Sequence, residues 1–168
     1  MRGSSMFALL PVVVMAGGLW AGSSASAAPS PRPETRRDLA GVLIKPVAAK
    51  DLCLEVADDN SGNGALVTLY TCTGRDNQRW TLDGGMIRTG LPGHRCLDVR
   101  TGNGRNGAAT NIYDCNNTRG QQWHFVGDKL ASGINGTCLT VVAGNFAPGG
   151  GVLNWECVVS QDQAWEVS

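Results

Sequence analysis

The sequence predicts an all-β protein in which three tandem copies of one unit close into a compact barrel with threefold symmetry. Cysteines recur at a fixed step, since Cys53, Cys96 and Cys138 are 43 and 42 residues apart. No window outside the N-terminal segment carries a clear 3.6-residue apolar stripe, and glycine supplies 23 of the 168 residues. Repeats of about 42 residues have to be recognised before single elements are assigned.

The repeat is visible at seven positions that are identical in all three copies at one register. They are Cys53, Leu54, Val56, Gly64, Cys72, Gln78 and Trp80, then Cys96, Leu97, Val99, Gly107, Cys115, Gln121 and Trp123, then Cys138, Leu139, Val141, Gly149, Cys157, Gln163 and Trp165. Chance does not account for this agreement, so each copy is expected to fold as one lobe of the barrel.

Residues 1–27 have the pattern of a secretory signal peptide. Arg2 is the only charged residue, and the apolar run from Met6 to Ala16 is too short to span a bilayer. Ala25, Ser26 and Ala27 supply the small residues that a signal peptidase requires. The segment therefore predicts a secreted, extracellular protein rather than one inserted in a membrane.

Residues 28–41 are expected to be a Pro-rich linker, with a basic processing site at Arg36–Arg37 as the alternative. The remaining residues, 42–168, are enough for one hydrophobic core.

Without the signal-like segment and its Arg2, the chain contains 13 Lys and Arg residues and 14 Asp and Glu residues. This nearly neutral balance argues against nucleic acid or an anionic membrane as partner. His94 and His124 occupy unrelated places in the repeat, so neither a metal site nor another cofactor is predicted.

Each copy carries short strands in a fixed order. In the first copy the expected strands are 42–44, 53–56, 66–70 and 80–82, and similar alternation recurs at 96–99 and 123–125. Turns that need positive φ are expected at Asn63–Gly64, Asn106–Gly107 and Asp83–Gly84–Gly85. A propeller blade also has four strands, but propellers typically close with about four to eight blades. Three copies therefore favour a threefold barrel.

The six cysteines are expected to form disulfides, because their number is even and an export signal precedes them. Six cysteines allow 15 pairings. If each copy closes its own bridge, the pairs are Cys53–Cys72, Cys96–Cys115 and Cys138–Cys157, each 19 residues apart.

The threefold Cys-Leu-[Asp/Glu/Thr]-Val, Cys and Gln-x-Trp pattern resembles the ricin B-type lectin family over residues 42–168. The resemblance implies a β-trefoil that binds sugars in up to three shallow pockets, one per lobe. It also implies the position of each pocket residue. The carboxylate is the third residue of the first cysteine's strand, the aromatic residue lies two before the second cysteine, and an amide often precedes the Gln-x-Trp glutamine.

This pattern makes the second lobe the best candidate for carbohydrate binding, through Asp98, Tyr113 and Asn111. A carboxylate can accept hydrogen bonds from two neighbouring hydroxyls, and an aromatic ring can pack on the C–H face of a pyranose. The second lobe departs from the pattern at Gly120, where an Asn is expected.

The other two lobes match the pattern less well. The first lobe has Tyr70 and Asn77, with Glu55 as a longer carboxylate, and is expected to bind with altered preference. The third lobe has Trp155 and Asp162, but Thr140 replaces the acid, so its site is expected to be weak or lost. The periodic tryptophans are expected in the core, and the periodic glutamines are expected to brace the backbone behind each pocket.

Three functions compete at this point. A non-catalytic lectin for galactose-type glycans or xylan- or arabinan-type plant polysaccharides fits the pattern best. An enzyme would need paired carboxylates, whereas the best-placed acids recur singly in separate lobes. The third function is a protein-interaction trefoil, such as a protease inhibitor or the receptor-binding subunit of a toxin or glycoside hydrolase complex, with a separately encoded protein partner.

Overall fold

The computed structural model describes residues 38–134 and 136–168. The predicted signal peptide and residues 28–37 of the predicted linker lie outside this range. The first strand begins at Leu39, so residues 39–41 of the predicted linker belong to the folded domain.

All regular elements of the described residues are β-strands or short 3₁₀ turns, which confirms the all-β prediction. The first lobe contains β1 (Leu39–Val42), β2 (Ile44–Pro46), β3 (Leu52–Val56), η1 (Ala57–Asp59), β4 (Val67–Thr71), η2 (Asp76–Gln78) and β5 (Trp80–Asp83). The second contains β6 (Met86–Thr89), β7 (Cys96–Val99), η3 (Arg100–Gly102), β8 (Ala108–Tyr113), η4 (Arg119–Gln121) and β9 (Trp123–Val126). The third contains β10 (Lys129–Ser132), β11 (Thr137–Val141), η5 (Val142–Gly144), β12 (Val152–Glu156), η6 (Gln161–Gln163) and β13 (Trp165–Val167).

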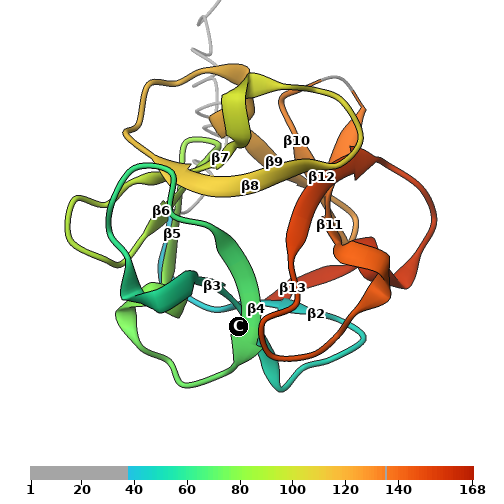
Figure 1. Ribbon diagram of the computed structural model, residues 1–168, viewed down its shortest axis with the longest axis horizontal. Coiled ribbons are helices and arrows are strands. Elements are labelled where there is room, and N and C mark those ends of the chain that lie inside the picture. Colours follow the sequence, from blue (N-terminus) through green and yellow to red (C-terminus); the bar gives the residue numbers. More distant parts are fainter. Residues whose placement is uncertain (1–37, 135) are drawn as a thin grey trace, which may run out of the picture. The chain divides into compact units, whose positions relative to one another are not determined.

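The strands pair in the same way in each lobe. The hairpins β3–β4, β7–β8 and β11–β12 lie within lobes, whereas β5–β6 and β9–β10 connect one lobe to the next. The last strand, β13, pairs with β2, so the end of the chain returns to its beginning. Figure 1 shows the resulting three lobes around a common centre, with β4, β8 and β12 closest to it. This is the predicted threefold barrel, a β-trefoil.

The periodic tryptophans lie in the core, as predicted. Trp80, Trp123 and Trp165 are buried, and their indole N–H groups donate to backbone carbonyls at 2.9, 3.0 and 2.9 Å. The acceptors are the repeated leucines Leu54, Leu97 and Leu139. Each tryptophan therefore fills the core and also ties the end of its lobe to the first-cysteine strand of the same lobe.

Each lobe closes its own disulfide, which confirms the pairing expected from the repeat. The bridges are Cys53–Cys72, Cys96–Cys115 and Cys138–Cys157. In the chain-entropy model, closing a loop of about 20 residues stabilises the fold by roughly 3 kcal/mol.

The lobes are joined by a ring of backbone hydrogen bonds from three repeated glycines. Gly64 N–H donates to Ile112 O at 2.8 Å and Gly107 N–H donates to Asn154 O at 2.9 Å. Gly149 N–H donates to Leu69 O at 2.7 Å and so closes the ring from the third lobe back to the first. All three glycines have φ between 82° and 90°, a region that favours glycine, which explains their identity in every copy.

Within residues 38–134 and 136–168, no helix has the length and apolar character needed to cross a membrane. The same residues contain no group of three or more His, Cys, Asp or Glu side chains placed to hold a metal ion.

Candidate functional site

The β7–β8 hairpin of the second lobe brings the predicted binding residues together. Asp98 on β7 lies opposite Asn111 on β8, and Tyr113 lies opposite Cys96 two residues further along. Asp98 and Asn111 are 9% and 4% exposed, whereas Tyr113 is 42% exposed. They surround a hollow of about 510 Å³. Its other lining residues are Gly64, Arg100, Thr101, Gly102, Asn116 and Thr118.

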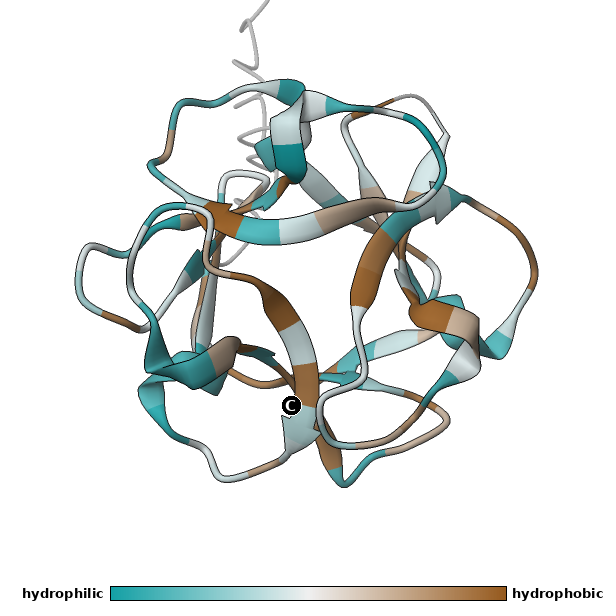
Figure 2. Cartoon of the chain, in the orientation of Figure 1, coloured by the Kyte–Doolittle hydropathy of each residue, from teal (hydrophilic) through white to brown (hydrophobic). Residues whose placement is uncertain are grey.

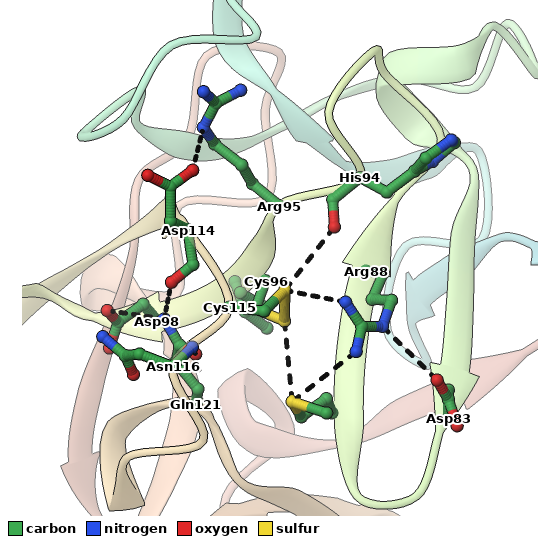
Figure 3. Close-up of a disulfide and its surroundings, with 12 residues drawn as sticks. Asp83, Arg88, His94, Arg95, Cys96, Asp98, Asp114, Cys115, Asn116 and Gln121 are labelled. Carbon is green, nitrogen blue, oxygen red and sulfur yellow. Dashed lines mark hydrogen bonds and ion pairs between the residues drawn. A yellow bond between two sulfur atoms is a disulfide. The ribbon is translucent and has the colours of Figure 1, made fainter.

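Gln121 holds the Asp98 carboxylate from behind. Its Nε2 donates to Asp98 Oδ2 at 3.3 Å and to Asp114 O at 3.0 Å, and its Oε1 accepts from Asn116 N–H at 2.8 Å. Figure 3 shows Gln121 between Asp98 and the backbone of Asp114, beside the Cys96–Cys115 bridge. The predicted role of the periodic glutamine as a brace is therefore confirmed in this lobe.

The end of β8 is fixed by contacts with Asn63 of the first lobe and Arg95 of the second lobe. Asp114 forms an ion pair with Arg95, with 3.1 Å between its Oδ1 and Arg95 Nε, and accepts a hydrogen bond from Asn63 Nδ2 at 2.8 Å. Arg95 Nε also donates to Asn63 Oδ1 at 2.7 Å, so the three side chains form one network. Because Asp114 directly follows Tyr113, this network limits the movement of the backbone that carries the aromatic ring.

Burial raises the pKa of Asp98 above its ordinary value of 3.8. The hydrogen bonds from Gln121 and from the Val99 backbone oppose this effect only in part. Desolvation disfavours the charged form of a carboxyl group, whereas donated hydrogen bonds favour it. Asp98 therefore takes up a proton at a higher pH than an exposed aspartate.

The close packing around Gly120 explains why the second lobe has no amide side chain directly before Gln121. A Cβ atom at this position would lie 2.7 Å from Asp98 Oδ1 and 3.4 Å from Val99 O. A side chain here would displace the carboxylate, so the position that Asp98 adopts favours glycine. The sequence pattern identifies the departure from the family but gives no sign of this contact.

In the first lobe, the amide groups of Gln78 and Asn77 donate to the carboxylate, whereas the buried Asn77 Oδ1 has no hydrogen-bond donor within the described residues. Glu55 Oε2 accepts from Gln78 Nε2 at 3.0 Å and from Asn77 Nδ2 at 3.4 Å, and Asn77 Nδ2 also donates to Val56 O at 3.1 Å. Glu55 and Asn77 are buried, and Tyr70 on β4 is 47% exposed. Burial raises the pKa of Glu55, the hydrogen bond from Gln78 lowers it, and the charge of Asp59 raises it further.

In the third lobe, the Thr140 hydroxyl makes two hydrogen bonds within the protein. It donates to Cys138 O at 3.0 Å and accepts from Gln163 Nε2 at 3.0 Å. Trp155 is 42% exposed and borders a hollow of about 420 Å³ together with Thr140 and Asp162. The third lobe thus keeps a pocket at the predicted place.

A comparison with models of known protein families shows to which family the chain belongs. The model of the ricin-type β-trefoil lectin domain matches residues 40–165. The chain belongs to this family. A comparison of this ricin-type lectin domain with curated protein sequences finds no match.

Solved structures share the fold of this ricin-type chain. The β-trefoil lectin of the Vibrio vulnificus hemolysin/cytolysin, with N-acetyl-D-lactosamine bound, is 26% identical, with a TM-score of 0.63, over 76% of this chain and 92% of that chain. ThreeFoil, a designed threefold symmetric protein, is 25% identical, with a TM-score of 0.67, over 76% and 97%. The C-half of an earthworm R-type lectin, in complex with GalNAc, is 19% identical and shares the fold, with a TM-score of 0.62, over 76% and 96%.

The polar walls of the second-lobe pocket were not predicted from the sequence. Arg100 and Thr101 follow the β7 strand directly, and Asn116 and Thr118 follow the second cysteine of the lobe. These positions vary among the three copies, so the repeat does not single them out. In the sequence, only their closeness to the β7 strand and to Cys115 could have indicated that they line the pocket.

Proposed function

We propose that this ricin-type protein is a secreted, non-catalytic lectin with its main binding site in the second lobe. One observation carries the proposal: the buried Asp98 carboxylate and the half-exposed Tyr113 ring face the same hollow. The carboxylate accepts hydrogen bonds from two neighbouring sugar hydroxyls, and the ring packs on the apolar face of the sugar. Gln121 keeps the carboxylate in place for this contact.

The proposed ligands are galactose-type glycans or xylan- or arabinan-type plant polysaccharides. Family membership supports a carbohydrate ligand, and two structural neighbours are described with N-acetyl-D-lactosamine and GalNAc bound. Arg100, Thr101 and Asn116 add exposed polar groups around Asp98, which suits a ligand with many hydroxyl groups.

We also propose that the protein is not catalytic, because its buried carboxylates Glu55 and Asp98 do not form a pair in one pocket. Glycoside hydrolysis generally needs two carboxyl groups on either side of one bond. Glu55 and Asp98 belong to separate lobes, and each accepts a hydrogen bond from the glutamine of its own lobe. Secretion is supported by the signal-like residues 1–27 and by three disulfides, which persist in oxidising compartments.

A glycan array with the purified, oxidised protein tests this function, followed by calorimetric titration of the best ligand. Replacing Tyr113 with alanine is expected to weaken binding at least fivefold, because the stacking surface contributes about 1 kcal/mol or more. The matched variant Tyr70→Ala removes the equivalent ring of the first lobe and is expected to have a smaller effect. Release of reducing sugar from the bound glycan, or an array without any hit, would contradict the proposal.

A further inference from the structure

The guanidinium group of Arg88 lies against the disulfide of the second lobe. Arg88 on β6 is opposite Cys96 on β7, and its Nη1 donates to Cys115 Sγ at 2.9 Å, as Figure 3 shows. The first and third lobes have Lys45 and Ala131 at the equivalent position, opposite the residue that follows the periodic tryptophan. Within residues 38–134 and 136–168, all contacts of this kind to a cysteine sulfur involve the second-lobe bridge.

A second contact holds the guanidinium in this place. Arg88 Nε forms an ion pair with Asp83 Oδ2 at 3.4 Å, which leaves Nη1 directed at the sulfur. The Arg88 side chain is only 29% exposed. A partly buried charge acts more strongly on a neighbouring charge than it does in water. Arg88 is therefore placed to stabilise negative charge that forms on the sulfur atoms of the bridge.

The bridge can be reached from solution at one of its two sulfurs. Cys96 is fully buried, whereas Cys115 is half-buried. The other residues of the loop 114–119 are exposed, and Figure 2 shows this loop largely in teal, the colour of hydrophilic residues. Cys72 and Cys157 are half-buried in the same way. Access is thus similar in the three lobes, and the guanidinium group distinguishes the second.

We propose that the Cys96–Cys115 bridge is a thiol-exchange site, which a dithiol in solution opens while the other two bridges stay closed. A thiolate of the dithiol bonds to Cys115 Sγ, the bond between the two cysteines breaks, and Cys96 leaves with the electron pair. The second thiolate then attacks the mixed disulfide and releases Cys115 beside Arg88. The bridge gains two electrons, the dithiol becomes a disulfide, and its two protons pass to the solvent or to the released sulfurs.

The surroundings of Cys115 also favour the open form at equilibrium. As a thiolate, Cys115 can accept a hydrogen bond from Arg88, and as a thiol it can donate to His94 O, which lies 3.5 Å from the sulfur. Hydrogen bonds to charged groups are the stronger kind, and a disulfide whose reduced form is stabilised is more easily reduced. We expect an equilibrium constant for reduction at least about tenfold above that of the other two bridges, equivalent to about 30 mV.

Opening the bridge loosens the end of β8 beside the second-lobe pocket. Tyr113 and Asp114 directly precede Cys115, and Tyr113 pairs with Cys96 across the hairpin. The disulfide is the covalent tie between these two strand ends. The exchange site would thereby regulate sugar binding. This consequence rests on the proposed lectin function, whereas the exchange chemistry does not.

Partial reduction of the oxidised protein tests the site. The protein is equilibrated at a series of ratios of reduced to oxidised dithiothreitol and blocked with iodoacetamide. Peptide mass spectrometry then measures the open fraction of each bridge, and circular dichroism shows that the protein is folded. The Cys96–Cys115 bridge is expected to be half open at a ratio at least about tenfold lower than the other two. Equal midpoints, or an earlier opening of another bridge, would overturn the proposal.

Matched variants test the role of the guanidinium group. Arg88→Met removes the charge, keeps a long side chain and should bring the midpoint of the second-lobe bridge to those of the other two. Arg88→Lys keeps the charge and should restore most of the difference. Lys45→Met is the control in the first lobe and should leave the three midpoints unchanged. A preserved difference in folded Arg88→Met would overturn the inference.

Hydrogen exchange of the protein with only this bridge open reports on the pocket without any sugar. The backbone amides of residues 112–114 are expected to exchange at least about tenfold faster than in the oxidised protein, because local opening costs less free energy. Unchanged exchange would overturn the link to the pocket. Faster exchange in a protein that binds no glycan on the array would contradict the lectin function and leave the exchange site in place.

Discussion

At the scale of single residues, the environment of one carboxylate determines how the second-lobe pocket responds to pH. Asp98 is buried at the base of the hollow, and burial raises its pKa above 3.8 despite the hydrogen bond from Gln121. Only the ionised carboxylate can accept hydrogen bonds from two sugar hydroxyls with both of its oxygens. Protonation of this one group therefore removes the main polar contact of the pocket.

We expect ligand binding by the second lobe to be lost on acidification while the protein is still folded, at a higher pH than for an aspartate with an unshifted pKa. Between the unfolded and the raised folded pKa, the folded protein binds the proton more readily, so Asp98 contributes increasing stability as the pH falls. Calorimetric titrations across pH 3 to 7, with a melting curve at each pH, measure both effects. Asp98→Asn should bind weakly at every pH, without this titration. A binding midpoint that coincides with unfolding would contradict the expectation.

From the sequence, only those residues of the candidate site whose positions are fixed relative to the repeated cysteines could be predicted. Asp98 and Tyr113 follow from their register with the cysteines, and the structure places both at one hollow. The contact between Gly120 and Asp98 and the free oxygen of Asp162 depend on side-chain packing between elements. Such contacts leave no periodic trace, so the sequence pattern identifies Gly120 only as a departure and Asp162 only by its position before the Gln-x-Trp glutamine.

At the scale of elements, the short 3₁₀ turns position the binding strands. η2, η4 and η6 carry Gln78, Gln121 and Gln163, which are fully buried. Each glutamine donates to the side chain two residues after the first cysteine of its lobe and to the backbone carbonyl of the residue before the second cysteine. The turn and both pocket strands of a lobe thus form one unit.

Gly120→Ala is expected to impair binding by the second lobe with a smaller effect on folding. The added Cβ would lie 2.7 Å from Asp98 Oδ1, so the carboxylate must move away from the hydroxyls that it accepts. We expect at least tenfold weaker binding, equivalent to about 1.4 kcal/mol. Titration with the best glycan, together with a melting curve, measures both. The control is Gly127→Ala, where the added Cβ meets nothing within 4 Å although φ is positive. Unchanged binding by folded Gly120→Ala would show that Asp98 tolerates the displacement.

Strands were predictable where they carry repeated residues. The expected strands at 53–56, 80–82 and 96–99 agree with β3, β5 and β7 to within a residue. β6 and β10 carry none of the seven repeated residues and were not singled out. They are defined by hairpin pairing with β5 and β9, which depends on the turns between them.

At the scale of the whole molecule, three equivalent lobes share one core and one ring of glycine hydrogen bonds. Tryptophans inside this core and outside it should therefore behave differently. Trp123→Ala is expected to lower the free energy of unfolding by about 3–5 kcal/mol, because it empties a buried site and leaves the Leu97 carbonyl without its donor. Urea denaturation of the oxidised protein measures this loss. The exposed Trp155→Ala is expected to change stability by about 0.5 kcal/mol or less. Equal losses for the two variants would contradict this division.

The threefold symmetry also identifies one residue that weakens the core. Asn154 on β12 is fully buried, and it lies opposite Leu139 as Leu69 lies opposite Leu54 and Ile112 lies opposite Leu97. Neither its Oδ1 nor its Nδ2 has a hydrogen-bond partner within the described residues. The other two lobes have aliphatic side chains here, so the fold does not require an amide.

Asn154→Leu is therefore expected to raise the free energy of unfolding by about 1–3 kcal/mol, the cost of leaving a buried polar group unsatisfied. Leucine has a similar size and restores the residue type of the other lobes, so packing should change little. Urea denaturation of the oxidised protein measures the gain. The reverse substitution, Leu69→Asn, places the same amide in the first lobe and should destabilise the protein. Glycan titration should give unchanged affinity for the second lobe, since Asn154 does not line its hollow. A loss of stability in Asn154→Leu would contradict this expectation, and a buried water molecule that satisfies the amide would produce such a loss.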